Sequence, residues 1–240
     1  MKIGIYCTVC RHELNLALAT LHFAESSEYI SDIAILITDD KNCAATRLTD
    51  KITIYSENFG SGYSRSIQDG GYDQIAARNY LLEKMEETEA DWILMHDADD
   101  IYALDFYQYV VAVGIDSDAV TCSCYTVTTD LDLCAPANKV QLTGPALLVD
   151  PHTRAWKKSL GLRYVKSDGV EKFFSNHSRH CGVIFPEDIT LSCTGGLYHF
   201  HLHALLNKRH SQKISGFPVL DYTLPENIRQ FLENNNELFI

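Results

Sequence analysis

The sequence predicts an α/β protein built on a mostly parallel β-sheet with helices on both faces. Two runs of strand length, Ile33–Thr38 and Trp92–Met95, are almost entirely apolar, as is typical of strands buried on both sides. Segments with apolar residues at helical spacing lie between such runs, at Asn15–Ala24 and Gln74–Glu89. Strands that alternate with helices favour a parallel sheet with crossover helices.

The remaining elements follow from the same patterns. Lys2–Thr8 and Lys51–Ser56 complete the strands of the first hundred residues. Beyond them we expect a smaller mixed sheet, with strands at Ala119–Thr128, within Gln141–Val149 and at Tyr198–His201. The segments expected to be helical in this half are Ile101–Gly114, Gly169–His177, Ala204–Ile214 and Pro225–Asn235.

Composition restricts the class of protein. Apolar residues make up 46% of the 240 residues and charged residues 22%, as in ordinary soluble globular proteins. The longest stretch without acids, Lys or Arg, Ile189–Asn207, holds three histidines and a glycine pair, so we expect no membrane span. The N-terminus lacks the apolar run of a signal peptide. We therefore interpret the eight cysteines as reduced thiols in a cytoplasmic protein, with Cys7 as a buried filler.

The net charge of −12 is unevenly distributed. Residues 151–240 carry 11 Lys and Arg against 8 Asp and Glu, a net charge of +3. The run from Arg154 to Lys166 contains five basic residues and no acid. We interpret it first as a solvated helix face, and second as a surface for an anionic partner such as nucleic acid.

The most informative feature is an acidic cluster. Asp97, Asp99 and Asp100 directly follow the apolar strand Trp92–Met95. Carboxylates that lie so close repel one another unless a positive charge sits among them. A hard divalent cation, Mn²⁺ or Mg²⁺, would supply that charge and accept oxygen ligands. The alternative is the N-terminus of a helix over Ile101–Gly114, where the helix dipole favours acids.

The sequence Asp97-Ala98-Asp99 resembles the DxD motif of GT-A glycosyltransferases of the family 2 type. The upstream Ala76-Ala77-Arg78-Asn79 resembles the start of a helix in the same family. The resemblance implies a GT-A fold in one domain over residues 1–240. Residues 1–105 would bind a nucleotide-diphospho-sugar, most often a UDP-sugar, and residues 106–240 would bind the acceptor.

The resemblance also assigns roles to residues. Asp99 would bind the metal, and Asp97 would hold the ribose and contact the metal through water. Arg78 would either add positive charge near the phosphates or hold Asp97 in place. Asp39 or Asp40, after the second strand, would contact the nucleobase or ribose. The full expected nucleotide-sugar site is Thr8, Cys10, Asp39, Asp40, Arg78, Asp97 and Ala98.

Three histidines recur at every second position near the end of the chain. On a strand, His199, His201 and His203 would share one face. GT-A enzymes often supply a histidine from this region to the metal, so the resemblance implies a ligand here, with His201 chosen first. The alternatives are histidines packed on the next helix and a zinc site made of all three.

An inverting transfer needs a carboxylate to accept the proton of the acceptor. The resemblance places it in the segment around Asp168 and Glu171, and Asp168 is the first choice. The same pair has the spacing of a helix capping box, and the two roles are compatible. If neither residue is a base, a retaining enzyme is expected.

Two other functions fit part of the pattern. A nucleotidyltransferase also combines such a sheet with acids and Mg²⁺, but Thr8–His12 lacks the glycine-rich loop expected after its first strand. A non-catalytic module that binds nucleotide-sugars is the third possibility. No motif identifies the acceptor, which would be a glycan, a lipid-linked sugar, a protein or a modified base in DNA.

Overall fold

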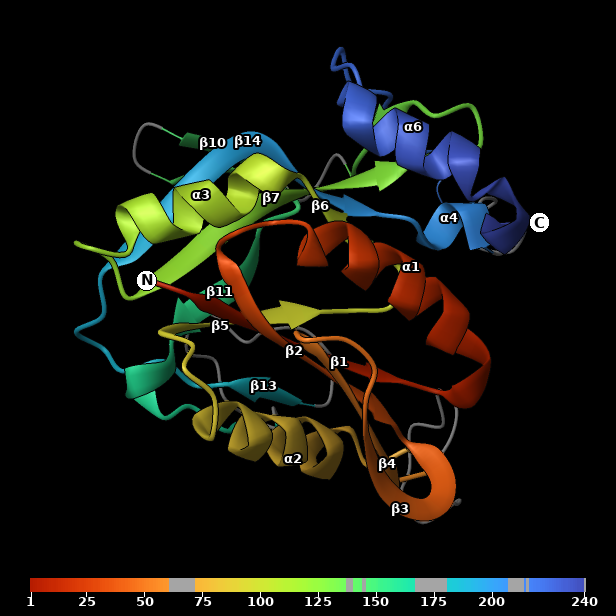
Figure 1. Ribbon diagram of the computed structural model, residues 1–240. Coiled ribbons are helices and arrows are strands. Elements are labelled where there is room, and N and C mark those ends of the chain that lie inside the picture. The colour runs from red at the N-terminus through yellow and green to blue at the C-terminus, as the bar shows by residue number, and fades with distance from the viewer. Residues whose placement is uncertain are drawn as a thin grey trace.

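The computed structural model describes residues 1–60, 72–136, 140–143, 146–166, 181–206, 214 and 216–239. Its main feature is a large sheet with strand order β3-β4-β2-β1-β5-β11-β7-β14-β6, with β8 paired to β7 (Figure 1). The strands are β1 (Ile3–Val9), β2 (Ile30–Ile37), β3 (Asp39–Arg47), β4 (Ile52–Asn58), β5 (Trp92–His96), β6 (Asp100–Tyr102), β7 (Ala119–Val127), β8 (Leu133–Cys134), β11 (His152–Lys157) and β14 (Leu191–His201).

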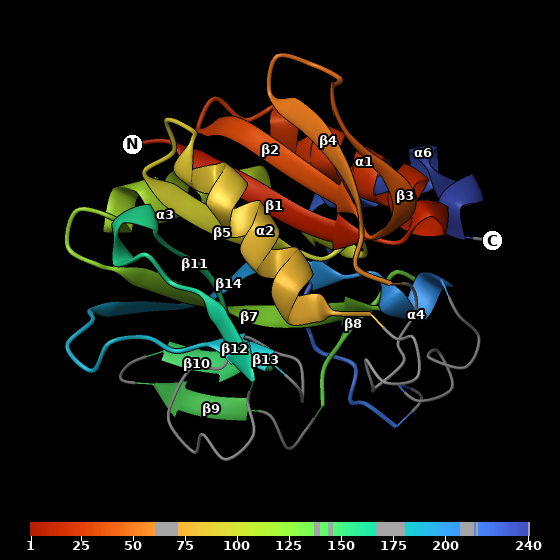
Figure 2. The same ribbon diagram turned by 90° about the horizontal axis from the view of Figure 1, so that it is seen from below.

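Helices cover both faces of this sheet. Figure 1 shows α1 and α3 on one side and α2 on the other, and Figure 2 shows α2 across β1 and β5. Two small antiparallel sheets lie beside the large one. The remaining elements are α1 (Leu14–Glu25), α2 (Gln74–Glu86), α3 (Leu104–Val113), α4 (His203–Leu206), α6 (Glu226–Asn234), β9 (Val140–Thr143), β10 (Ala146–Val149), β12 (Tyr164–Lys166), β13 (Cys181–Val183) and the 3₁₀ turns η1 (Arg11–Glu13), η4 (Lys158–Leu160) and η5 (Asn236–Phe239).

The strands that run parallel form the centre of the fold. β1 pairs in parallel with both β2 and β5, and β2 pairs in parallel with β4. Alternate residues of β1 enter two separate cores: Ile5 packs with α1 and α3, while Tyr6 packs with α2. Burial on both faces explains the apolar runs Ile33–Ile37 of β2 and Trp92–Met95 of β5. The predicted α/β class with a largely parallel, helix-flanked sheet is confirmed.

Two predicted elements differ beside the acidic cluster. The strand β3, which begins at Asp39, was not predicted, because it is an exposed antiparallel edge strand with a polar sequence. The helix expected at Ile101–Gly114 begins only at Leu104, because β6 first pairs with β14. Asp100 therefore belongs to a strand, and the helix-terminus interpretation of the acids is wrong for this residue.

The second half also shows differences. Gln141–Val149 holds two short strands that pair as a hairpin. The helix expected at Ala204–Ile214 is described only as α4, His203–Leu206, and the helix expected at Gly169–His177 lies outside the described residues. The basic run, expected as a helix face, instead forms β11, η4 and β12.

Two expectations from composition concern the state of the cysteines and the character of the helices. Cys7 is fully buried within β1. The described cysteines whose state is given are free thiols: Cys7, Cys10, Cys122, Cys124, Cys134 and Cys193. Among the described residues, no helix is both long and apolar enough to cross a bilayer.

Candidate active site

The site lies where several strands end at one edge of the sheet. β5 ends at His96, and the turn that follows carries Asp97, Ala98 and Asp99. β14 runs parallel to β7 and ends at His201, which pairs with Asp100 across the ladder to β6. The backbone N–H of Leu202 donates to the carbonyl of Asp99 at 2.7 Å, which fixes the acidic turn against the end of β14.

Asp99, His201 and His203 converge. His203 Nδ1 lies 2.7 Å from Asp99 Oδ2, and His201 Nε2 lies 3.6 Å from the same oxygen. The two imidazole rings stack with centroids 5.3 Å apart. One ligand atom from each residue lies within 4.8 Å of the others. All three side chains are partly exposed, so a ligand can reach them. Two imidazoles and one carboxylate form a donor set suited to a divalent transition metal.

The same acids control the charge of His201. Desolvation opposes a positive charge on this ring, but the carboxylates of Asp99 and Asp100 raise its pKa to about 9. His201 is therefore protonated at neutral pH in the absence of a metal. A cation that binds His201 must displace this proton, since only the neutral ring offers a lone pair.

Asp97 has different partners. Arg78 Nη2 lies 3.1 Å from its Oδ1, and Arg154 Nη1 lies 2.9 Å from its Oδ2. Burial alone would raise the pKa of Asp97, but the two guanidinium groups, Arg154 most strongly, hold it below its usual value. Of the two roles considered for Arg78, the geometry matches the one in which it holds Asp97, because Arg78 is itself buried.

Sequence reasoning missed Arg154, which contacts both Asp97 and Asp100. It was grouped with a solvated helix face, but its side chain is only 2% exposed. The ladder between β11 and β7 shifts register at this residue, which is a β-bulge, and bulges re-aim side chains near active sites. Arg154 Nη2 also lies 3.4 Å from Asp100 Oδ2. In the sequence, Arg154 is flanked by β-branched Thr153 and by apolar Ala155 and Trp156. These neighbours could have indicated a strand rather than a helix.

Asp100 is completely buried among charged and polar partners. Its Oδ1 lies 2.9 Å from His199 Nε2 and 3.0 Å from His201 Nδ1. Burial would raise the pKa of Asp100, but His199 and Arg154 hold it well below the usual range. Because Asp100 contacts both strands β11 and β14 in this way, it connects the acidic turn to the C-terminal half of the chain.

The predicted run of three histidines divides into two environments. His199 and His201 lie on β14, whereas His203 begins α4, so the expected common strand face ends at His201. His199 is fully buried and stacks on Tyr102 with centroids 4.6 Å apart. Burial lowers the pKa of His199. His199 therefore lies outside the group formed by Asp99, His201 and His203.

The expected nucleotide residues lie at the ends of β1 and β2. Asp39 Oδ1 accepts a hydrogen bond from the backbone N–H of Arg11 at 2.8 Å, and Asp40 forms an ion pair with the Arg11 side chain. Thr8 is half-buried in β1, and Cys10 lies near Thr38. Ala98 is buried, and its carbonyl accepts a hydrogen bond from the Thr20 hydroxyl.

The candidate bases Asp168 and Glu171 lie outside the described residues.

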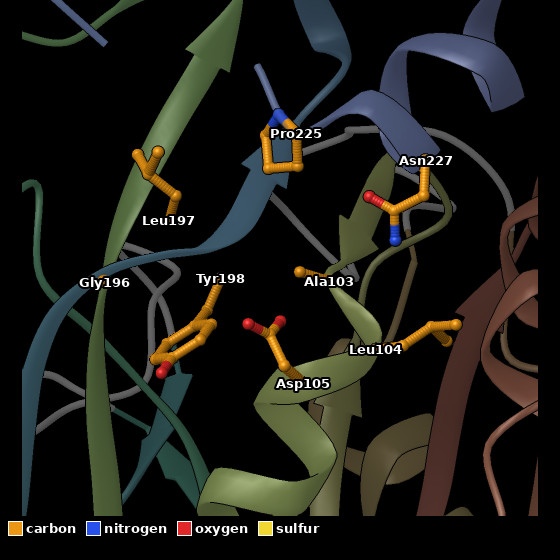
Figure 3. A pocket seen from close by; sticks show the side chains of 8 residues that line it. All are labelled: Ala103, Leu104, Asp105, Gly196, Leu197, Tyr198, Pro225 and Asn227. Carbon is orange, nitrogen blue, oxygen red and sulfur yellow. The ribbon is translucent and has the colours of Figure 1, made fainter. Parts of the chain in front are cut away.

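A separate open pocket of about 540 Å³ lies between the start of α3, β14 and the start of α6 (Figure 3). Asp105, Tyr198 and Asn227 line it together with apolar side chains. Its lining includes neither the acidic turn nor the histidines, and we assign it no role in the site.

Replacing Arg154 tests whether it holds the acidic cluster. Arg154→Ala leaves Asp97 with one guanidinium and Asp100 without any, so the free energy of unfolding should fall by about 3–5 kcal/mol in urea denaturation. Arg163→Ala removes an exposed ion pair with Glu86 and should cost at most about 1 kcal/mol. Equal, small losses in the two variants would contradict the assigned role of Arg154.

Comparisons with known proteins establish the fold. No protein-family profile matches the chain, and no curated protein sequence matches it. The solved structures that match include S. aureus TarS 1-349 in complex with UDP-GlcNAc, with a TM-score of 0.52 and 12% identity over 84% of this chain and 58% of that fragment. The cytidylyltransferase IspD of Francisella tularensis has a TM-score of 0.39 and 13% identity over 67% of this chain and 74% of that one. The similarity to the TarS fragment, at 12% identity, shows that this chain shares its α/β fold and nothing more specific. The similarity to IspD is too weak to support a conclusion.

Proposed function

We propose that the protein is a metal-dependent glycosyltransferase that moves a sugar from a nucleotide-diphospho-sugar to an acceptor hydroxyl, with a UDP-sugar as the donor that the family resemblance implies. The observation that carries the proposal is the convergence of Asp99, His201 and His203 at the carboxyl edge of the parallel strands. In open α/β sheets this edge is where ligands bind. The fold shared with a protein that was crystallised with UDP-GlcNAc supports the same choice of donor.

These three residues would hold Mn²⁺ or Mg²⁺, and two imidazole ligands favour Mn²⁺, because Mg²⁺ prefers oxygen. The cation would neutralise the diphosphate that leaves the sugar. Asp97 is held at both oxygens by Arg78 and Arg154, so its position is fixed before any ligand binds. In this arrangement Asp97 orients the donor, while Asp99 supplies the charged ligand.

The nucleoside would lie over the ends of β1 and β2. Asp39 and Asp40 are both held by Arg11, from its backbone and its side chain, which fixes two acceptors just beyond the carboxyl end of β2. Such acceptors fit the hydroxyls of a ribose or the N–H of a base. Asp168 or Glu171 would take the proton of the acceptor in an inverting transfer.

The competing functions predict different ligands. A nucleotidyltransferase would bind a nucleoside triphosphate, but the connection from β1 to α1 contains no glycine and forms the 3₁₀ turn η1. A binding module without catalysis would retain UDP-sugars unchanged. Incubation with a panel of UDP-sugars and Mn²⁺, followed by measurement of free UDP, therefore separates the transferase from both alternatives.

Removing the charge of Asp99 should abolish activity. In Asp99→Asn the charged metal ligand is lost, so Mn²⁺-dependent release of UDP should fall by about 10²-fold or more. The control is Asp118→Asn, in which a carboxylate paired with Lys157 at the opposite end of β7 is neutralised. Full activity of Asp99→Asn, or undiminished wild-type activity in excess EDTA, would refute the metal site.

Replacing Asp39 or Asp40 by Ala should weaken donor binding. Each change removes a contact present in both the ground state and the transition state, so the donor KM should rise more than kcat falls. Asp32→Ala, near the amino end of β2 and so at the opposite end of that strand, is the matched control and should leave KM unchanged. An unaltered KM in both Asp39→Ala and Asp40→Ala would remove these residues from the nucleotide site.

A further inference from the structure

The residue that follows Arg78 in α2, Asn79, holds a strand from the second half of the chain. Asn79 Nδ2 donates to the backbone carbonyl of Tyr164, the first residue of β12, at 3.0 Å. The backbone N–H of Tyr164 donates in return to Asn79 Oδ1 at 2.7 Å. Because a side-chain amide offers both a donor and an acceptor, one residue satisfies both backbone groups. Asn79 therefore fixes the backbone of Tyr164 against the helix that carries Arg78.

The hydroxyl end of Tyr164 is held by two parallel strands of the large sheet. It lies 2.7 Å from the hydroxyl of Tyr6 in β1 and donates to Sδ of Met95 in β5 at 3.0 Å. Tyr164, Tyr6 and Met95 are all buried. With its backbone tied to α2 and its hydroxyl tied to β1 and β5, the ring of Tyr164 has a fixed orientation.

The ring between these two anchors lies against the guanidinium of Arg78. Arg78 Cζ lies 5.0 Å from the centroid of the Tyr164 ring. Arg78 is 3% exposed, and a charge removed from water needs partners. Its Nη2 lies 3.1 Å from Asp97 Oδ1, and its Nη1 lies 3.5 Å from Met95 Sδ. Since a thioether sulfur is a weak acceptor, the aromatic face adds an attraction that the sulfur does not supply.

The two arginines that hold Asp97 are supported differently. Arg154, on β11, contacts Asp97 Oδ2 and also has Asp100 as a partner. Arg78 contacts Asp97 Oδ1 and rests on the ring of Tyr164. Loss of that ring would therefore loosen one side of Asp97 without removing either of its arginines.

We propose that Tyr164 and Asn79 are positioning residues for the donor site. Asn79 seats Tyr164, and the ring of Tyr164 keeps the guanidinium of Arg78 against Asp97. The consequence for donor binding rests on the proposed function, because it assumes that Asp97 orients the donor. In this way a strand of the second half sets the position of a carboxylate in the first half.

A double-mutant cycle in the ligand-free protein tests the contact itself, whatever the reaction. Tyr164→Leu, Arg78→Met and the double variant are unfolded in urea. We expect the two changes to couple by at least about 5-fold in the unfolding equilibrium constant, because the ring and the guanidinium interact out of contact with water. The matched control is Tyr80→Leu, which removes an α2 tyrosine that faces Lys84 instead, and it should be additive with Arg78→Met.

Binding of UDP in Mn²⁺, measured by isothermal titration, tests the consequence for the donor. Tyr164→Leu should weaken UDP binding by about 5-fold or more, because Asp97 is no longer fixed before the ligand binds. Tyr164→Phe keeps the ring and should restore wild-type affinity, and Tyr80→Leu should leave affinity unchanged. A ring that only filled the core would instead cost stability without changing the affinity for UDP.

An additive cycle, or wild-type UDP affinity in folded Tyr164→Leu, would overturn the proposal. If the wild-type protein bound no UDP, the proposed function would fail, while the cycle would still decide whether Tyr164 holds Arg78. Should circular dichroism show that Tyr164→Leu is unfolded, Asn79→Ala takes its place in both measurements. It should couple to Arg78→Met and weaken UDP binding by about 3-fold, because it frees the backbone of Tyr164, and no change in either quantity would likewise refute the proposal.

Discussion

Mutual repulsion among the three carboxylates that follow β5 is the constraint on which the rest of the site depends. The three acids offset this repulsion through contacts with different sets of partners. Asp97 contacts two guanidinium groups, and Asp100 is enclosed by Arg154, His199 and His201. Asp99 contacts both of the partly exposed histidines, His201 and His203. The acids are therefore not equivalent: Asp97 and Asp99 are partly exposed, whereas Asp100 is fully buried.

This arrangement connects the two halves of the chain. The acidic turn follows a parallel strand of the first half, while Arg154 and the histidines come from β11 and β14 of the second. β11 lies between β5 and β7, and the bulge at Arg154 directs its side chain toward the acids. A buried guanidinium without partners would be costly, as would buried carboxylates, so each half stabilises the charges of the other. The fold and the site are thus mutually dependent.

The sequence predicted those features that local pattern determines. β1, β2 and β5 are apolar because both of their faces are buried, and α2 follows from its apolar spacing. β3 was missed because an exposed edge strand needs no apolar pattern. Arg154 was misassigned because its burial depends on partners that are more than fifty residues away. Likewise, the register that places Cys124 beside His199 is a long-range pairing, which neither residue reveals alone.

The central claim is that the carboxyl edge of the sheet binds a nucleotide through a metal. Isothermal titration of the intact protein with UDP, in Mn²⁺ and again in EDTA, tests it most directly. We expect binding in Mn²⁺ that is at least about 10-fold tighter than in EDTA, equivalent to about 1.4 kcal/mol or more of metal-dependent affinity. Equal affinity under both conditions, or no binding of UDP in either, would contradict it.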